Sequence, residues 1–143
     1  MKKIIAVLSV AACSGVWASN AWLTVLGDPD DLSVNTIEVD PIPVSLPGLQ
    51  RIMHVRVSRS APRINWDGVP YRSYESKVLF ECDKHKARYV SIVFYLQPGW
   101  TGVSHRTSEY SKADARRMEF RDVKPNPTLR IIRAACPTAI VVN

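Results

Sequence analysis

The chain has 143 residues, of which 46% are hydrophobic and 22% charged, and its formal net charge is +6 at pH 7. This length predicts a single domain of ordinary size, with room for a hydrophobic core, rather than a protein of several domains. No apolar run after the first 21 residues is long enough for a membrane-spanning helix.

The chain begins with the features of a secretory signal peptide. Lys2 and Lys3 form a basic start, and the apolar run IIAVLSVAACSGVWA follows and ends in small residues. We expect residues 1–21 to be the signal peptide and residues 22–143 to form a single domain. A cut after Ala18 is the alternative. Either cut predicts an exported protein.

A competing interpretation of the leader concerns Cys13. The tetrapeptide VAAC, which ends at Cys13, resembles a bacterial lipobox, and this cysteine would then carry a lipid anchor. Such a leader would be unusually short, and GVWA would remain in the mature chain. We therefore favour removal of Cys13 with the leader.

Five stretches with strand patterns follow, separated by turn residues. In chain order they are residues 22–27, 35–40, 51–59, 71–82 and 87–96. The last two are expected to form a hairpin across the turn DKHK, with Tyr74, Ser76, Val78, Phe80 and Cys82 on the core face. Strict alternation of polar and apolar residues also places Met53, Val55 and Val57 on one face.

The connections carry proline, glycine and asparagine. The proline-rich residues 41–48 predict an extended segment at the surface or at a sheet edge. Residues 60–70 predict a loop, with a tight turn at Asp67-Gly68. Residues 97–102 predict another turn, and weaker strands are expected around residues 102–110 and 116–121.

A short helix is expected near the C-terminus. Asn126 and Pro127 suit the N-cap and the first helical position, and Pro137 ends the helix. Leu129, Ile132 and Cys136 fall on one helical face. The fold class is therefore α+β: a small antiparallel sheet with a C-terminal helix packed on it.

Two cysteines, Cys82 and Cys136, follow the leader. In an oxidising compartment such a pair favours a disulfide, which would stabilise the domain by roughly 4 kcal/mol and clamp the helix to the sheet. The alternatives are two inert buried thiols or, less favoured, a metal site that includes Cys82 and His85, for which a second pair of ligands is missing. No motif for a cofactor occurs, and no cofactor is expected.

Motifs of common enzymes, such as GxSxG, GxxxxGK[ST], GxGxxG and HExxH, are absent from the sequence. His54, His85 and His105 fall on a polar strand face or near turns, so we expect solvated side chains rather than catalytic ones. The acidic stretch DPDDLSVNTIE lacks the glycine of an EF-hand loop, and a calcium loop there is only an alternative. We predict neither an enzyme nor a metal protein.

Charge is distributed unevenly along the chain. Residues 22–49 contain five acidic residues and no basic one, whereas residues 50–143 contain seventeen basic and eight acidic ones. Such a body attracts anionic partners, although it could also be a solvated surface partly neutralised by the acidic arm. The best candidate for a binding patch flanks one predicted loop: Arg56, Arg59, Arg63 and Arg72.

Aromatic residues could also bind a ligand. Trp66, Tyr71, Tyr74, Tyr95 and Trp100 could stack on sugars or bases, but we expect most of them to pack in the core or in turns. A protein or an anionic glycan is the expected class of partner. Nucleic acid is not expected, because the protein is exported.

The two-cysteine framework and the stretch YESKVLFEC, with Tyr74, Ser76 and Cys82, resemble the bacterial surface-adhesin protein E family over roughly residues 22–136. This resemblance implies a small antiparallel sheet with a packed helix and a disulfide between Cys82 and Cys136. It also implies the outer membrane or surface of a Gram-negative bacterium and binding to host matrix or serum proteins. No binding motif can be carried over to this chain.

Our first hypothesis is therefore an exported, non-enzymatic protein that binds a protein or anionic ligand through a basic surface. The second is a periplasmic structural or accessory protein with a partner in its own cell envelope. The third is an envelope hydrolase, which would need His54 or His105 beside a carboxylate and a hydroxyl.

Overall fold

The computed structural model of the protein describes residues 21–137. All of the predicted signal peptide except Ala21 lies outside this range, and so does Cys13, the site of the alternative lipid anchor. No helix among the described residues is long and apolar enough to cross a membrane.

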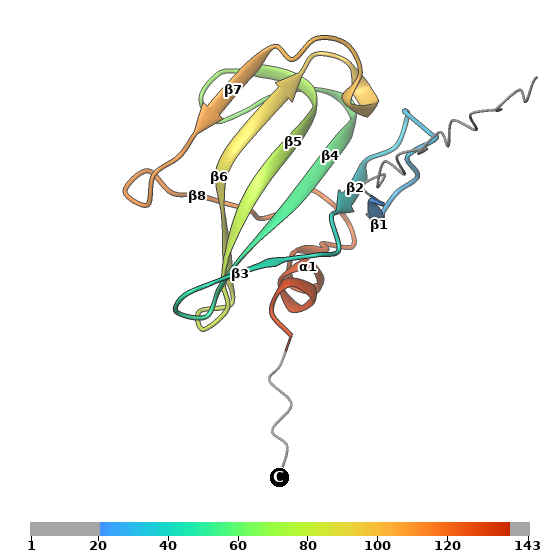
Figure 1. Cartoon of the computed structure of the whole chain (residues 1–143). Helices are drawn as coiled ribbons and strands as arrows, with labels where there is room; N and C mark the ends of the chain where they lie inside the picture. Colours follow the sequence, from blue (N-terminus) through green and yellow to red (C-terminus); the bar gives the residue numbers. More distant parts are fainter. Residues whose placement is uncertain (1–20, 138–143) are drawn as a thin grey trace, which may run out of the picture.

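The described chain folds into an antiparallel sheet with one helix against it (Figure 1). Its strands are β1 (Leu23–Leu26), β2 (Thr36–Val39), β3 (Val44–Leu46), β4 (Gln50–Ile64), β5 (Pro70–Glu81), β6 (Lys86–Tyr95), β7 (Arg106–Glu109) and β8 (Arg116–Arg117). The order across the sheet is β1-β2-β4-β5-β6-β7. The α+β class and the β5–β6 hairpin predicted from the sequence are thus confirmed.

Three long strands, β4, β5 and β6, form the centre of the sheet, and each outer edge is divided between two short strands. β2 and β3 pair with successive parts of β4, and β7 and β8 pair with successive parts of β6. The proline-rich segment contributes β3, whose three residues are all exposed. It is an edge strand, as its prolines predicted.

The predicted loop at residues 60–70 is shorter than expected. β4 continues to Ile64 and β5 begins at Pro70, so that only the turn around Asp67-Gly68 separates them. The β4–β5 register shifts between Ser58 and Arg63. Pro62 lies within this irregular part, where its missing N–H removes no regular ladder bond, and for this reason the strand can continue past it.

One face of the sheet carries the core. Met53, Val55 and Val57 of β4 are buried there, and so are Val78 and Phe80 of β5. The buried Ser76 hydroxyl of the same β5 row donates to the Val55 carbonyl oxygen at 2.6 Å, so this polar group has a partner in the core. The period-two faces predicted for these two strands are confirmed.

A helix and the segment before it cover this core. α1 (Thr128–Ala135) buries Ile131, Ile132 and Ala135 against the sheet. The predicted helical face was partly wrong, because Leu129 is 58% exposed. The helix begins one residue later than expected, at Thr128. Its buried face is centred on Ile131 and Ile132, so Leu129 lies outside it.

The start of α1 uses the predicted asparagine. The Asn126 Oδ1 atom accepts hydrogen bonds from the Thr128 backbone N–H at 2.9 Å and from its hydroxyl at 2.6 Å. Pro127 occupies the cap position itself. Asn126 was expected at the N-cap position but lies one residue before it. Its side chain still accepts the hydrogen bond of the first helical N–H, that of Thr128.

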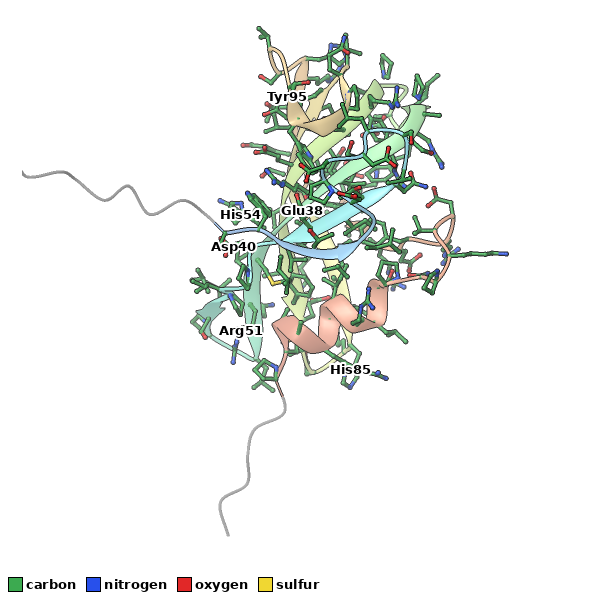
Figure 2. The ribbon with its side chains drawn as sticks, turned by 90° about the vertical axis from the view of Figure 1, so that its right-hand side faces the viewer. Glu38, Asp40, Arg51, His54, His85 and Tyr95 are labelled. Atoms are coloured by element: carbon green, nitrogen blue, oxygen red, sulfur yellow. A yellow bond between two sulfur atoms is a disulfide. The ribbon has the colours of Figure 1, made fainter. Side chains whose placement is uncertain are left out.

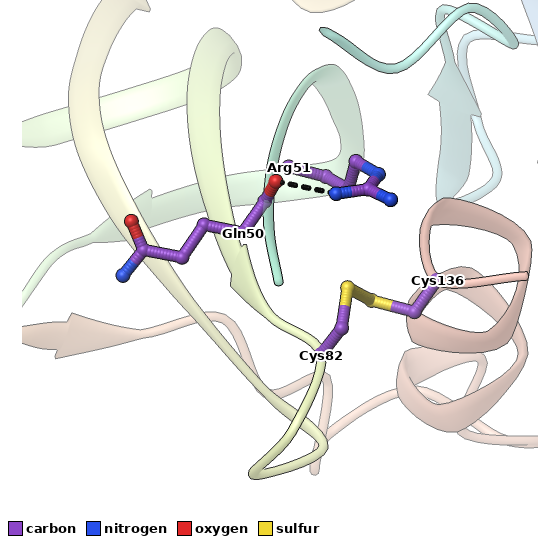
Figure 3. Close-up of a disulfide and its surroundings, with 4 residues drawn as sticks. All are labelled: Gln50, Arg51, Cys82 and Cys136. Atoms are coloured by element: carbon purple, nitrogen blue, oxygen red, sulfur yellow. Dashed lines mark hydrogen bonds between the residues drawn. A yellow bond between two sulfur atoms is a disulfide. The ribbon is translucent and has the colours of Figure 1, made fainter. Parts of the chain in front are cut away.

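A disulfide joins Cys82, directly after β5, to Cys136, directly after α1 (Figure 3). Their Cα atoms are 5.4 Å apart, and 54 positions of sequence separate them. The Cys82 backbone N–H also donates to the Leu49 carbonyl oxygen at 3.0 Å, which ties the bridge to the beginning of β4. The predicted clamp between helix and sheet is confirmed.

Candidate functional site

Arg56, the first arginine of the predicted patch, points to the face of the sheet opposite the core. Its Nε donates to Glu38 Oε2 at 2.7 Å, and its guanidinium lies between the rings of Trp22 and Trp100. Glu38 is only 3% exposed. Arg56 therefore neutralises a buried carboxylate.

Arg59 and Arg63 lie on another part of β4 and share one carboxylate. Their guanidinium groups approach Asp122 Oδ2 at 3.1 and 2.8 Å. Arg59 is buried, with 7% exposure, because it continues the inward row that contains Val57. That two-residue spacing was visible in the sequence and could have indicated an inward side chain.

Arg72 of β5 bonds to carbonyl oxygens of the chain. Its Nε donates to the Arg59 oxygen at 2.8 Å, and its Nη2 donates to the Ser60 and Leu32 oxygens at 3.0 and 3.3 Å. The four arginines thus occupy three separate environments and each holds an intramolecular partner. A binding role for them stays a prediction, and their contacts favour structural roles.

A different group of cations lines an open groove beside the β5–β6 turn. The groove has a volume of about 200 Å³, and its charged lining residues are Glu81, Lys84, Lys86, Arg88, Lys112 and Arg117. Three of the cations come from the turn and from β6, one from the loop after β7, and one from β8. Sequence reasoning missed this group because its members are brought together by the β6–β8 pairing.

Within this cationic groove, Arg88 and Arg117 are direct partners across the β6–β8 ladder. Like charges in this arrangement repel each other. Glu119 Oε1 lies 3.7 Å from Arg117 Nη1 and partly offsets that charge. The Nε atom of Arg88 is buried and has no hydrogen-bond partner among the described residues. The groove therefore has an excess of positive charge.

The histidines are exposed and come from separate parts of the sheet. Figure 2 shows His54 on the sheet near Asp40, and His85 at the far turn below α1. His105 follows the turn after β6 and its backbone N–H donates to the Phe94 carbonyl oxygen. None of the hydrogen bonds of the described residues joins a histidine side chain to a carboxylate or a hydroxyl.

The acidic loop after β1 uses its carboxylates for its own turns. Asp28 Oδ1 accepts from the Asp30 N–H, and Asp31 Oδ1 accepts from the N–H and the hydroxyl of Ser33. These hydrogen bonds lower the pKa of Asp31 below its ordinary value. Within residues 21–137, no three His, Cys, Asp or Glu side chains gather closely enough to share a metal ion.

The predicted aromatic residues are divided between the two faces of the sheet: Tyr71 and Tyr74 lie on the core side, and Trp100 stacks on Arg56 on the other. Tyr71 and Tyr74 are buried, and the Tyr74 hydroxyl is 2.7 Å from that of Tyr89. Burial raises the pKa of Tyr74 and of Tyr89 above the ordinary value, so both hydroxyls stay protonated at neutral pH. Trp66 is 52% exposed and is the most accessible of the tryptophans in the predicted set.

These features define a small, disulfide-linked α+β domain whose distinctive surface is a cationic groove. Residues 22–137 match the surface-adhesin protein E family, and the chain belongs to that family. No curated protein and no solved structure matches it significantly. Membership implies an exported, cell-surface protein that binds a protein partner.

Proposed function

We propose that this protein is an adhesin of the outer cell surface, and that it binds acidic segments of a partner protein through the cationic groove. The observation that carries this proposal is the Arg88–Arg117 pair, which places two positive charges opposite each other with lysines around them. An acidic side chain bound between them would relieve their repulsion.

The geometry favours carboxylates as ligands. Arginine presents parallel donors that match a carboxylate, whereas lysine adds a flexible point charge. Lys86, Lys112 and Arg88 have no carboxylate within ion-pair distance among the described residues, while Lys84 lies 3.7 Å from Glu81. The groove therefore offers several cations that an acidic peptide could pair.

The direct test measures binding of poly-L-glutamate to a groove variant with Lys86→Gln, Arg88→Gln and Lys112→Gln. A matched control carries Lys77→Gln, Arg106→Gln and Arg133→Gln, which removes the same charge from other elements. We expect the groove variant to lose affinity by about tenfold or more and the control by much less. Affinity should also fall as salt is raised.

Equal losses in the two variants would show that only net charge matters and would contradict a defined groove. Binding to heparin but not to poly-L-glutamate would replace the acidic peptide by a sulfated glycan. A variant with Arg63→Gln and Arg72→Gln tests the more exposed of the arginines predicted from the sequence in the same assay.

Location at the outer surface needs its own experiment. Protease added to intact cells should degrade the chain, as followed by immunoblotting. Protection until the outer membrane is permeabilised would instead support the periplasmic accessory protein.

A further inference from the structure

A small cavity lies on the core side of the sheet, apart from the cationic groove except that Arg117 borders both. Its volume is about 60 Å³, and its lining includes Arg59, Asn65, Trp66, Tyr74, Tyr89 and one carboxylate, that of Glu119, which is paired with Arg117 and Arg121. One water needs only about 10–15 Å³ of such space, so the cavity has room for a ligand of several non-hydrogen atoms.

The first unusual feature of this cavity is Arg59. More than nine-tenths of this side chain is buried, and its Nη1 bonds to Asp122 at 3.1 Å. Its Nε is buried and has no hydrogen-bond partner among the described residues. Because Arg59 and Arg63 share the single carboxylate of Asp122, this cluster keeps a surplus positive charge.

The second unusual feature is Asn65, in the turn between β4 and β5. Its Oδ1 accepts from the backbone N–H groups of Asp67 and Val69, both at 2.8 Å. These two bonds fix the orientation of the carboxamide, because a flipped amide would set donors against donors. The Nδ2 group is consequently a donor, and it too is buried without a partner in the described chain.

The two tyrosines add a third donor. Because their hydroxyls are 2.7 Å apart, one donates to the other, and the second keeps its own hydrogen for another acceptor. A buried donor without an acceptor is unfavourable, and native proteins rarely contain two of them in one place. Arg59, Asn65 and the tyrosine pair, the residues that carry these donors, all line this one cavity.

We propose that this cavity binds a carboxylate group, either as a small monocarboxylate or as the carboxylate end of a larger organic acid. Two carboxylate oxygens would satisfy the free donors, and the negative charge would balance the surplus charge of Arg59 and Arg63. Aromatic rings line the remaining wall and suit the flat faces of the group. Trp66 both lines the cavity and is half exposed, so it lies where a ligand would enter.

The test titrates the whole protein with sodium acetate and follows the side-chain N–H resonances of Arg59 and Asn65 by NMR. Sodium chloride at the same ionic strength is the reference. We expect saturable shifts of both resonances with acetate, with one site and a dissociation constant in the millimolar range, since acetate has few atoms. Shifts that do not saturate, or equal shifts with chloride, would mean that the cavity does not bind the carboxylate group specifically and would overturn the proposal.

Asn65→Asp separates a binding role from a structural one. An aspartate can accept the same two backbone hydrogen bonds, but it replaces the free donor by an acceptor beside Arg59. Acetate affinity should fall by about tenfold or more. The matched control is Asn35→Asp, because Asn35 Oδ1 also accepts a backbone N–H, from Ser60, outside the cavity.

Tyr89→Phe provides a second variant that keeps the ring and removes one hydroxyl, and it should weaken acetate binding by a few fold. Unchanged affinity in folded Asn65→Asp and folded Tyr89→Phe would overturn the proposal. The outcome is independent of the cationic groove, since the groove variant should bind acetate in the cavity as the native protein does.

Discussion

The Arg56 guanidinium lies 3.9 Å from the ring centroid of Trp100, and it lies 4.3 Å from that of Trp22 on its other side. Trp22 precedes β1, and Trp100 ends the short 3-10 helix η1 (Pro98–Trp100). The same arginine bonds to Glu38 of β2. One side chain of a central strand thus links both the N-terminal edge and the turn after β6 to the sheet.

We predict that Arg56→Ala destabilises the protein strongly. It removes the stacking on two indoles and leaves Glu38, which is 3% exposed, without its ion-pair partner. Loss of one partner of a buried pair costs about 3–5 kcal/mol in the free energy of unfolding. Urea unfolding followed by tryptophan fluorescence measures this. Arg106→Ala, an exposed arginine on β7, is the control and should change stability by less than about 0.5 kcal/mol.

Reduction of the disulfide should weaken the domain without removing its sheet. The bridge between Cys82 and Cys136 closes a loop of 54 positions, and its loss should lower the free energy of unfolding by about 2–5 kcal/mol. Urea unfolding with and without reductant measures the change. The Cys82→Ser/Cys136→Ser variant should match the reduced protein and should not respond to reductant. Equal stability of the oxidised and reduced native protein would contradict a structural role.

Gly27→Ala should be far more damaging than Gly68→Ala. Both glycines have positive φ angles, of 85° and 75°. A Cβ on Gly27 would lie 2.1 Å from the backbone oxygen of Asn35, whereas one on Gly68 would meet no atom within 4 Å.

Gly68→Ala therefore carries only the backbone strain, about 1 kcal/mol. Gly27→Ala must also push the end of β1 away from Asn35, directly before β2. The loss in the free energy of unfolding should therefore rise to about 3 kcal/mol or more. The midpoints of thermal unfolding of the two variants, compared side by side, measure this difference. Similar midpoints would contradict the tight approach at Gly27.

Alkaline pH should destabilise the protein through the tyrosine pair. Burial raises the pKa of Tyr74 and of Tyr89 in the folded state, while the unfolded chain has ordinary values near 10. Their contribution to stability is complete below about pH 10, and it is lost as the pH rises further, because the unfolded state ionises first. Tyrosinate absorbance should therefore rise together with unfolding.

The variant Tyr74→Phe/Tyr89→Phe provides the control for this pH effect. It removes both members of one hydrogen bond without changing the rings, so stability at pH 7 should change little. Its stability should fall less steeply above about pH 10 than that of the native protein. The same steepness in both proteins would assign the alkaline transition to other groups.

Local patterns in the sequence determined much of the fold. Strict alternation in β4 and β5 placed Met53, Val55, Val57, Val78 and Phe80 in the core, because side chains on a strand alternate between faces. The β5–β6 hairpin and the C-terminal helix followed from turn and cap residues. The two cysteines after the leader identified the bridge, since a pair in an exported protein has few alternatives.

Only the tertiary structure decided which charged side chains are available for binding. Charge alone could not show that Arg59 turns inward to Asp122, or that Arg56 neutralises the buried Glu38, because their partners are distant in sequence. Nor could it place Arg88 opposite Arg117, since β8 is two residues long and its register depends on the whole β6 edge. Local periodicity is encoded residue by residue, whereas a groove or a cavity exists only after separate segments have packed together.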